Sequence, residues 1–282
     1  MNVKKAGIIL KRGSDAPKRI CRELVEWFSA RSIETVIDTI PSNLDILVIL
    51  GGDGTLLHVA EKASRLEIPV VGVNLGGLGF LTEVVVDECF EVLETILAGP
   101  VAIENRMMIK ARLFSGKETS EWFYALNDVV ISKGTVDRLV RLSVWADKEY
   151  ITTYRADGIV FSTPTGSTAY NLSAGGPIVV PSLSSILVTP ICPFMLESRP
   201  VLLPPHVDLT TTMAGSVEDV KVIVDGRSVW DMKENDLLEV QAAKKPLRLI
   251  CSPQKGYFEI LRNKLNWGGR MTSLPSGRPQ ED

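Results

Sequence analysis

The spacing of hydrophobic residues divides the chain into two parts that meet near Gly99 and Pro100. In the first part, short apolar runs alternate with stretches whose apolar residues recur every three to four positions. The strand candidates lie at 6–10, 33–38, 45–50 and 68–74, and the periodic stretches lie at 15–32, 55–66 and 87–99. Unbroken apolar runs are typical of strands buried on both faces, and the periodic spacing predicts helices. This alternation predicts an α/β domain with a parallel sheet over residues 1–100.

Beyond Pro100 the helical periodicity fades, and pieces rich in β-branched and aromatic residues are separated by turn residues. They lie at 106–114, 121–132, 138–147, 149–162 and 220–226. Such pieces predict a second, mainly antiparallel β domain over residues 101–252. A short helix is expected within 251–267, in a return segment at 253–270. The polar, turn-rich end at 271–282 predicts a disordered tail.

Composition narrows the class of protein. The 282 residues carry a net charge of −3, which lacks the strong basic excess of a general nucleic-acid-binding protein. No apolar run approaches the ~20 residues of a membrane span. The four cysteines form no CxxC pair and the chain has two histidines, so a structural zinc site is not expected. We therefore expect a cytoplasmic protein that binds neither nucleic acid nor membranes.

The stretch "ILGGDGTLLHVA" at 49–60 places three glycines around Asp53, between a predicted strand and a predicted helix. Open α/β sheets bind ligands at the carboxyl ends of their strands. Glycines let backbone N–H groups approach an anion closely, and the helix N-terminus adds partial positive charge. A carboxylate and a phosphate repel each other, so Asp53 at this position indicates a further role. It could hold Mg²⁺ or take a proton from an attacking hydroxyl. A tight turn with a solvated aspartate remains the alternative.

Generic nucleotide-binding motifs do not account for this loop. The chain has no GxxxxGK[ST] loop of the P-loop ATPases, and Gly52-Asp53-Gly54 does not continue as the dinucleotide fingerprint GxGxxG. A GxSxG nucleophile elbow is absent as well.

Three further segments strengthen the interpretation. "NLGGLGFLTE" (74–83) is a second glycine-rich turn, "LNDVVISKG" (126–134) places an Asn-Asp pair at a strand, and "DGIVFSTPTGSTAYNLSAGGPIV" (157–179) is dense in glycine and hydroxyls. In order and spacing, the chain resembles the inorganic polyphosphate/ATP-NAD kinase family over nearly all of residues 1–270. GGDGT is shared with lipid kinases and 6-phosphofructokinases, whereas the threonine-glycine block is specific. The resemblance implies an α/β domain followed by a β-sandwich domain.

The resemblance also implies roles for individual residues. Asp53 is the catalytic base and touches the acceptor ribose beside Gly54. Asn127 and Asp128 bind NAD, for which a strand-end Asx turn is the alternative. The adenosine-binding turn comprises Thr168, Ala169, Tyr170, Asn171, Leu172 and Ser173. Tyr170 can stack on a base, although an isolated tyrosine is more often a core residue.

Four more positions follow from the same resemblance. Arg155 and Asp157 match ligand-contacting positions. Arg138 matches a position that contacts the dinucleotide, sometimes across a subunit interface. Arg227 matches a variable position near the adenine. A fifth position, His58, lies one helical turn after Gly54, which places it toward the phosphates; a satisfied surface or core histidine is the alternative.

These roles predict transfer of the ATP γ-phosphoryl group to the 2′-hydroxyl of the adenosine ribose of NAD⁺, giving NADP⁺. A divalent cation, Mg²⁺, is the expected cofactor, with ligands left open. NAD and ATP are the expected small-molecule partners, and the chain is expected to form a homodimer or homotetramer. A GGDGT-type lipid kinase and a non-catalytic dinucleotide-binding sensor are the alternatives.

Overall fold

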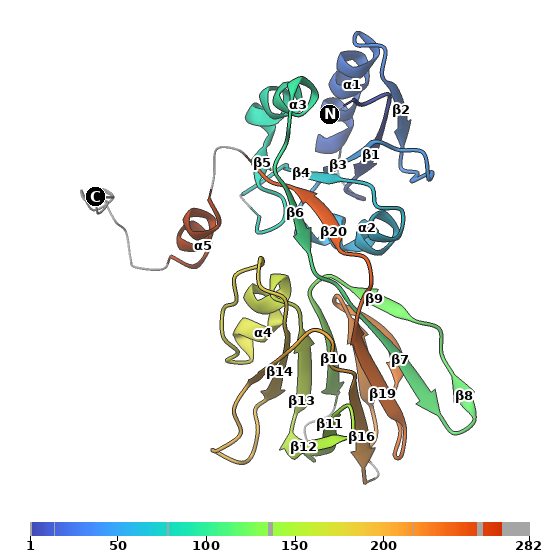
Figure 1. Cartoon of the computed structure of the whole chain (residues 1–282), viewed down its shortest axis with the longest axis vertical. Helices are drawn as coiled ribbons and strands as arrows, with labels where there is room; N and C mark the ends of the chain where they lie inside the picture. Colours follow the sequence, from blue (N-terminus) through green and yellow to red (C-terminus); the bar gives the residue numbers. More distant parts are fainter. Residues whose placement is uncertain are drawn as a thin grey trace, which may run out of the picture.

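The computed structural model describes residues 2–13, 15–77, 79–134, 138–215, 217–252 and 256–266. An α/β domain and a β domain lie end to end (Figure 1), with the N-terminal segment in the first of them. Among the residues in these ranges, no helix is long and apolar enough to cross a membrane. The predicted tail at 271–282 lies outside the described residues.

The α/β domain follows the predicted alternation closely. Its elements are β1 (Lys5–Leu10), α1 (Ala16–Ser29), β2 (Glu34–Ile37), β3 (Ile46–Leu50), α2 (Asp53–Arg65), β4 (Val70–Asn74), β5 (Val84–Val85), a 3-10 turn (Val86–Glu88) and α3 (Cys89–Ala98). The strands β2, β1, β3 and β4 are parallel neighbours in that order. Because β1, β3 and β4 are parallel, their carboxyl ends meet at one edge of the sheet.

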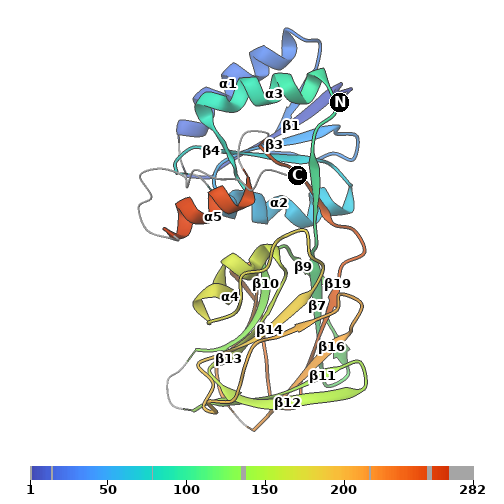
Figure 2. The same ribbon diagram turned by 60° about the vertical axis from the view of Figure 1, so that its left-hand side comes forward.

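The two faces of this sheet carry different helices. Side chains of α1 and α3, including Leu24, Phe28 and Leu93, pack with β1 and β3 on one face. Helix α2 packs on the other face through Leu56 and Ala60. Figure 2 shows α1 and α3 on the outer side of the sheet and α2 on the side toward the β domain.

The first sheet extends past the predicted boundary near Gly99 and Pro100. Strands β6 (Ile103–Arg106) and β20 (Leu247–Ile250) join it beyond β4, with β20 parallel to β4 and antiparallel to β6. The observed division therefore differs from the predicted 101–252 domain by one strand at each end. The reason is that the edge of β4 would otherwise expose unpaired backbone groups, which these two strands satisfy.

The β domain contains two sheets. In chain order its elements are β7 (Ile109–Ser115), β8 (Glu118–Thr119), β9 (Phe123–Ala125), β10 (Asp128–Lys133), β11 (Val140–Ala146), β12 (Glu149–Ala156), β13 (Gly158–Ser162), a 3-10 turn (Thr165–Thr168), α4 (Tyr170–Ser173), β14 (Ile186–Ile191), β15 (Val201–Leu203), β16 (Leu209–Ala214), β17 (Val220–Val224), β18 (Arg227–Asp231) and β19 (Leu237–Ala242). One sheet runs β15-β14-β13-β10-β17-β18 and the other runs β12-β11-β16-β19-β7-β8. One hydrophobic core joins their inner faces, with Val129 and Phe161 from the first sheet and Leu142 and Val240 from the second. The predicted α/β plus all-β fold class is confirmed.

Helix α5 (Tyr257–Leu265) falls within the stretch expected to be helical. Helix α2 contacts the β domain. Its residues Leu56 and Val59 share a hydrophobic cluster with Met108 and Leu126 of the β domain. Leu126 directly precedes the Asn-Asp pair, so the helix that begins at Asp53 packs against the segment that carries Asn127 and Asp128.

Candidate active site

Asp53 lies where a buried strand turns into a helix. Strand β3 ends at Leu50, and α2 begins at Asp53 after the N-cap residue Gly52, which has no side chain to cap the first turn. A Cβ atom on Gly51 would overlap the side chain of Thr55, so only glycine fits there. The free N–H groups of the first turn and the helix dipole make this edge favourable for anions.

The Asp53 carboxylate is held by the second glycine-rich turn. Its Oδ1 accepts hydrogen bonds from the Leu81 and Thr82 amides, both at 3.1 Å, and from the Thr82 hydroxyl at 2.9 Å. Its Oδ2 accepts one bond, from the Phe80 amide at 2.9 Å. A carboxylate has about four lone-pair positions. Among the residues that the structure describes, Oδ1 is therefore saturated, while Oδ2 keeps a position open for a ligand proton.

A relay behind the carboxylate fixes its orientation. The Asn74 amide donates to the Thr82 hydroxyl at 2.8 Å, and the Asn74 oxygen accepts from the Gly76 amide at 2.9 Å. Gly79 lies so close that a Cβ atom there would overlap both the Asp53 carboxylate and the Thr82 hydroxyl. The glycines of the second turn thus let the backbone close over Asp53.

A second carboxylate, that of Asp225, fixes the backbone of the Asn127–Asp128 segment. Asp225 accepts hydrogen bonds from the amides of Leu126 and Asn127, each at 2.8 Å, and of Asp128 at 3.2 Å. Asp225 and Gly226 both have positive φ values, of 45° and 76°, in the tight turn between β17 and β18. Such turns favour Asp-Gly because both central residues need left-handed backbone.

Asp128 is buried in this cluster, with 5% of its surface exposed. Burial raises the pKa of Asp128 to about 7, the neighbouring Asp225 charge adds to the rise, and the Tyr170 N–H bond opposes it. Burial also raises the pKa of Asp225, against the three amide bonds that it accepts and the charge of Arg227. A carboxyl group that changes charge near neutral pH is typical of a functional position.

The threonine-glycine block wraps around the same segment. The Thr163 amide donates to the Asn127 carbonyl at 2.9 Å, and the Thr163 hydroxyl donates to the Leu126 carbonyl at 2.5 Å. Gly166 lies directly against the Asn127 backbone, where a Cβ atom would overlap it. The block then presents Tyr170, which is 43% exposed, at the start of α4.

Asn171 differs from its expected role. Its side chain is fully buried. Its amide nitrogen donates to the carbonyls of Ser167 at 3.2 Å and Pro177 at 3.1 Å, and its oxygen accepts from Thr189 at 2.6 Å. Every polar group of this side chain is therefore used inside the protein. The structure assigns the Asn171 side chain to the support of the turn, while Thr168, Ala169, Leu172 and Ser173 stay at least partly exposed.

Arg138, Arg155 and Asp157 lie away from this cluster. Asp157 precedes β13 and pairs with Lys133 at 2.7 Å, whereas Asp128 stands at the other end of the β10–β13 pair. Five residue steps along β10 separate the two ends, which is roughly 17 Å for a strand. Figures 1 and 2 agree, because α4 lies toward the α/β domain and β12 lies at the far end.

This far end carries an arginine-rich cavity of about 400 Å³, lined by Arg138, Leu139, Arg141 and Arg155. The Arg155 guanidinium lies 4.9 Å from the ring centre of Phe194. Three neighbouring guanidinium groups make this cavity favourable for an anion. One chain alone does not bring these arginines to Asp53.

The remaining predicted positions are exposed. His58 lies on α2 and is exposed, and its side chain has no hydrogen bond or ion pair with the part of the chain that the structure describes. Arg227 begins β18 and is exposed next to Asp225, so it belongs to the Asp128 cluster. Gly54 is exposed in the first turn of α2, where a Cβ atom would meet nothing within 4 Å.

Sequence reasoning missed two residues that hold the site together. Thr82 was part of the second glycine-rich turn but had no role, and Asp225 was not considered. The Asp-Gly pair in "VDGR" is a recognisable hairpin turn signal. It predicts a turn, however, and not that the aspartate would reach the amides of residues almost one hundred positions earlier.

The side chains near Asp53 offer few ligands for a divalent cation. Among the described residues, no three His, Cys, Asp or Glu side chains gather into a metal-binding group. Mg²⁺ often uses one or two carboxylates together with substrate phosphates and water. The open Oδ2 position of Asp53, at the helix end favourable for phosphate, fits a cation that is held chiefly by the substrate.

The fold and the site together define a two-domain kinase with a GGDGT loop at the carboxyl edge of its sheet. Sequence models of the ATP-NAD kinase N-terminal and C-terminal domains match residues 11–101 and 126–252, respectively. The NAD kinase of Geotalea daltonii is 40% identical over 284 residues, covering 95% of this chain and 100% of that protein. That of Syntrophobacter fumaroxidans is 42% identical over 278 residues, covering 93% and 98%. The chain belongs to the NAD kinase family.

Solved structures agree with this assignment. Yeast NADH kinase complexed with NADH is similar with a TM-score of 0.87 and 25% identity, covering 99% of this chain and 91% of that one. An NAD kinase from Archaeoglobus fulgidus in complex with ATP has a TM-score of 0.73 at 22% identity, covering 93% and 98%. The second likeness concerns the fold alone.

The raised pKa of Asp128 predicts a pH dependence of stability. In the folded chain the pKa of Asp128 is about 7, whereas the same carboxyl would have a pKa of 3.8 in an unfolded chain. The folded chain therefore keeps this proton at pH values where the unfolded chain has lost it. Its stabilising effect is complete below about pH 4 and is lost as the pH rises to 7. Between pH 5 and 8, the wild type should lose roughly 2–3 kcal/mol of unfolding free energy relative to Asp128→Asn. Urea unfolding of both proteins at several pH values measures this difference, and parallel curves would contradict it.

Proposed function

We propose that the chain transfers the γ-phosphoryl group of ATP to the 2′-hydroxyl of the adenosine ribose of NAD⁺, with Asp53 as the base. The single observation that carries this proposal is the Asp53 carboxylate, which accepts four hydrogen bonds from described residues and, with respect to those residues, keeps one Oδ2 position open beside the start of α2. A turn-forming aspartate would not need the oriented relay through Thr82 and Asn74.

The base, the start of α2 and the hydrogen-bond relay each have a separate role in the proposed reaction. Oδ2 of Asp53 accepts the proton of the 2′-hydroxyl as the ribose oxygen bonds to the γ-phosphorus. The bond from that phosphorus to the β,γ-bridging oxygen breaks in the same step, and ADP leaves with its electron pair. The free amides at the start of α2 stabilise the charge on the transferred group. A divalent cation, held there by Asp53 and the substrate, would supply further charge neutralisation. The relay from Asn74 through Thr82 holds the base at a fixed angle, so the rate gain comes mainly from positioning.

The dinucleotide is proposed to lie along the Asn127–Asp128 segment and the turn at 168–173. Asn127 and Asp128 supply donors and acceptors, and Asp128 can give a proton or accept one because its pKa is about 7. Tyr170 offers an exposed ring for stacking on the adenine, and Arg227 lies close by. Helix α2 packs on Leu126, which brings the two proposed sites to the same junction.

Tyr170→Ala is expected to raise the Michaelis constant for NAD several-fold, because a stacking surface worth about 1 kcal/mol is lost. The constant for ATP should change less. The ring is 43% exposed, so its removal should cost little folding stability. Tyr150→Ala is the matched control, because Tyr150 is 54% exposed on β12 at the far end of the domain. Equal NAD constants in the Tyr170 variant and the wild type would contradict the adenosine placement.

A second copy of the chain is proposed to bring Arg138, Arg155 and Asp157 to the dinucleotide, since one chain keeps them at the far end of β10 and β13. The surface beside Arg155 supports this pairing, because Phe194, Met195 and Leu196 are 62%, 51% and 82% exposed. Contiguous exposed apolar residues mark interaction surfaces.

Light scattering at micromolar concentration should therefore give at least twice the mass of one chain. Mixing refolded Asp53→Asn and Arg155→Ala chains should restore part of the activity that each lacks, because a mixed dimer holds one intact site. A monomeric mass, or no recovery on mixing, would contradict the shared site.

The proposed reaction is tested by ADP release with three acceptors. NAD⁺ should support release with ATP and Mg²⁺, while an NAD⁺ analogue lacking the 2′-hydroxyl and a diacylglycerol micelle should not. The comparisons give no support to the lipid-kinase or sensor alternatives. Release with the micelle would favour the first of them, and NAD⁺ binding without release would favour the second. The cytoplasmic location stays a prediction from the sequence.

A further inference from the structure

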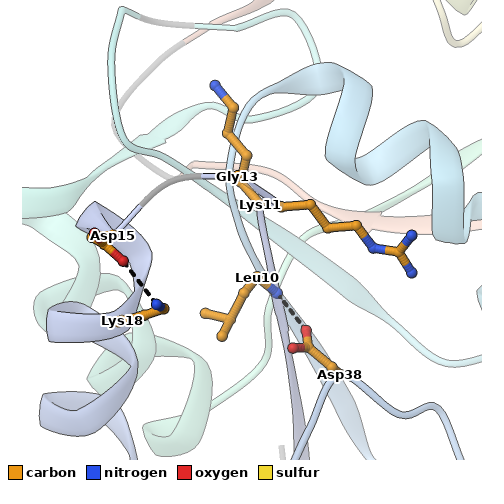
Figure 3. A pocket seen from close by; sticks show the side chains of 7 residues that line it. Leu10, Lys11, Gly13, Asp15, Lys18 and Asp38 are labelled. Carbon is orange, nitrogen blue, oxygen red and sulfur yellow. Dashed lines mark hydrogen bonds and ion pairs between the residues drawn. The ribbon is translucent and has the colours of Figure 1, made fainter.

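The loop after β1 borders a cavity of about 280 Å³, and none of its lining residues has a role in the reaction proposed above. Residues 10–13 form its strand side, Asp15 and Lys18 form its helix side, and Asp38 closes it. Figure 3 shows Lys11 and Gly13 where the chain leaves β1, the Asp15–Lys18 pair at the start of α1, and the Leu10–Asp38 contact beside that pair.

The charges in this cavity are unequally compensated. Lys18 forms an ion pair with Asp15 at 2.7 Å, and Asp38 accepts the Leu10 amide at 2.9 Å. The side chains of Lys11 and Arg12, in contrast, have no hydrogen bond or ion pair with any residue that the structure describes. The lining therefore carries three cations and two carboxylates, an excess of one positive charge, and Lys11 and Arg12 are the cations that no described carboxylate holds.

The helix beside the cavity adds to this charge. Helix α1 has no acidic residue in its first turn, and the side chain of its N-cap residue, Asp15, makes no bond to the helix amides. The positive end of the helix dipole is thus left for a ligand. Gly13 has a φ of 75°, a left-handed value that lets the loop turn sharply between β1 and α1.

The cavity adjoins the GGDGT loop. The Lys11 amide donates to the Leu50 carbonyl at 2.9 Å, and the Lys11 Cβ atom lies 3.2 Å from where a Cβ on Gly51 would stand. The Lys11 side chain therefore starts directly beside the first glycine of the loop, from where its flexible stem can reach a phosphate at the start of α2.

The strand order places Lys11 and Arg12 on the side of the GGDGT loop that is opposite to the Asp53 carboxylate. Strand β3 lies between β1 and β4, and the GGDGT loop follows β3. Asp53 is held by residues 80–82, which follow β4, so its carboxylate is turned to the β4 side. Lys11 and Arg12 follow β1 on the opposite side. Phosphoryl transfer needs the attacking and leaving oxygens roughly in line on opposite sides of the phosphorus.

We propose that Lys11 and Arg12 bind the polyphosphate of the donor on its leaving-group side. This inference rests on the proposed function and deepens it. The cavity volume of about 280 Å³ lies at the lower end of the ~300–1,000 Å³ of typical small-molecule sites, a size that suits phosphate groups. The Arg12 guanidinium can hold two phosphate oxygens at once, and the Lys11 ammonium provides a mobile point charge. ATP and inorganic polyphosphate share this chemistry.

The test measures binding of inorganic tripolyphosphate by calorimetry to the wild type, Lys11→Met and Arg12→Met. Each variant should bind on the order of tenfold more weakly, since a hydrogen bond to a charged group is lost. Affinity for NAD⁺ should stay within about twofold. Lys4→Met is the matched control, because Lys4 is exposed and directly precedes β1, at the end of that strand opposite to Lys11. Lys11→Arg should retain most of the affinity, which separates lost charge from lost folding.

Kinetics with each donor complete the test. The Michaelis constant for ATP, for polyphosphate, or for both should rise in Lys11→Met and Arg12→Met, and the donor that responds is the natural occupant. Tripolyphosphate affinities and donor constants that match those of Lys4→Met would overturn the proposal. Failure of the proposed function is a separate result, namely a wild type that forms no NADP⁺ while tripolyphosphate binding still depends on Lys11.

Discussion

Asp53→Asn is expected to lower turnover by a factor on the order of 10²–10⁴ while NAD still binds. The substitution keeps the shape of the side chain and an oxygen that can accept from Leu81 and Thr82. It places an NH₂ group, which cannot take a proton, at the position where Oδ2 is open. The amide would also face the Phe80 N–H, so a small loss of stability should accompany the loss of rate.

Magnesium dependence separates the possible roles of this carboxylate. If Asp53 acts as the base, raising Mg²⁺ should leave the Asn variant slow. If it mainly holds the cation, raising Mg²⁺ should restore part of the rate. If it only forms the turn, Asn should serve nearly as well, because Asn also tolerates tight turns. Turnover and NAD affinity, each measured at low and high Mg²⁺, distinguish these outcomes.

Gly79→Ala should have the second largest effect, a loss of turnover on the order of 10²-fold without any change to a polar group. A Cβ atom at this position overlaps the Asp53 carboxylate and the Thr82 hydroxyl. The carboxylate must move away from its three amide donors, and a displacement of ~1 Å in a catalytic group can cost 10²-fold. The constant for ATP and the fold of the β domain should be largely unaffected.

The same turn provides the matched control for this variant. A Cβ on Gly77 would meet nothing within 4 Å, and its φ lies outside the left-handed range. Gly77→Ala should therefore keep nearly full turnover. Similar rates in Gly79→Ala and the wild type would show that the position of the Asp53 carboxylate does not limit the reaction. Similar losses in both alanine variants would point to flexibility of the whole turn instead.

Local patterns were sufficient to predict most of the α/β domain. The unbroken apolar run at 45–50 became β3, buried at every residue, and the periodic stretch at 15–32 became α1. The Asp15 position at the start of α1 was also foreseen, although its carboxylate bonds Lys18 and not the helix amides. These features depend on neighbours within a few positions, which is the information that a sequence pattern contains.

Features that depend on distant pairing could not be predicted. Strands β6 and β20 complete the first sheet from the far side of the domain boundary, because the edge of β4 needed a partner. Asp225 reaches Leu126 and Asn127 through a hairpin that only the folded β domain brings near. Asn171 matches the motif by letter, but its burial against Thr189 follows from packing and not from spacing.

The most direct test of the proposed reaction is the ³¹P NMR spectrum of the product formed by the purified protein from ATP, Mg²⁺ and NAD⁺. The Asp53 geometry predicts a new phosphomonoester resonance from the 2′-position of the adenosine ribose, growing in step with ADP and absent on the same timescale with Asp53→Asn. ATP consumption without that resonance, a phosphate on another hydroxyl, or an equal rate in the Asn variant would contradict the assignment of Asp53 as the base for the 2′-hydroxyl.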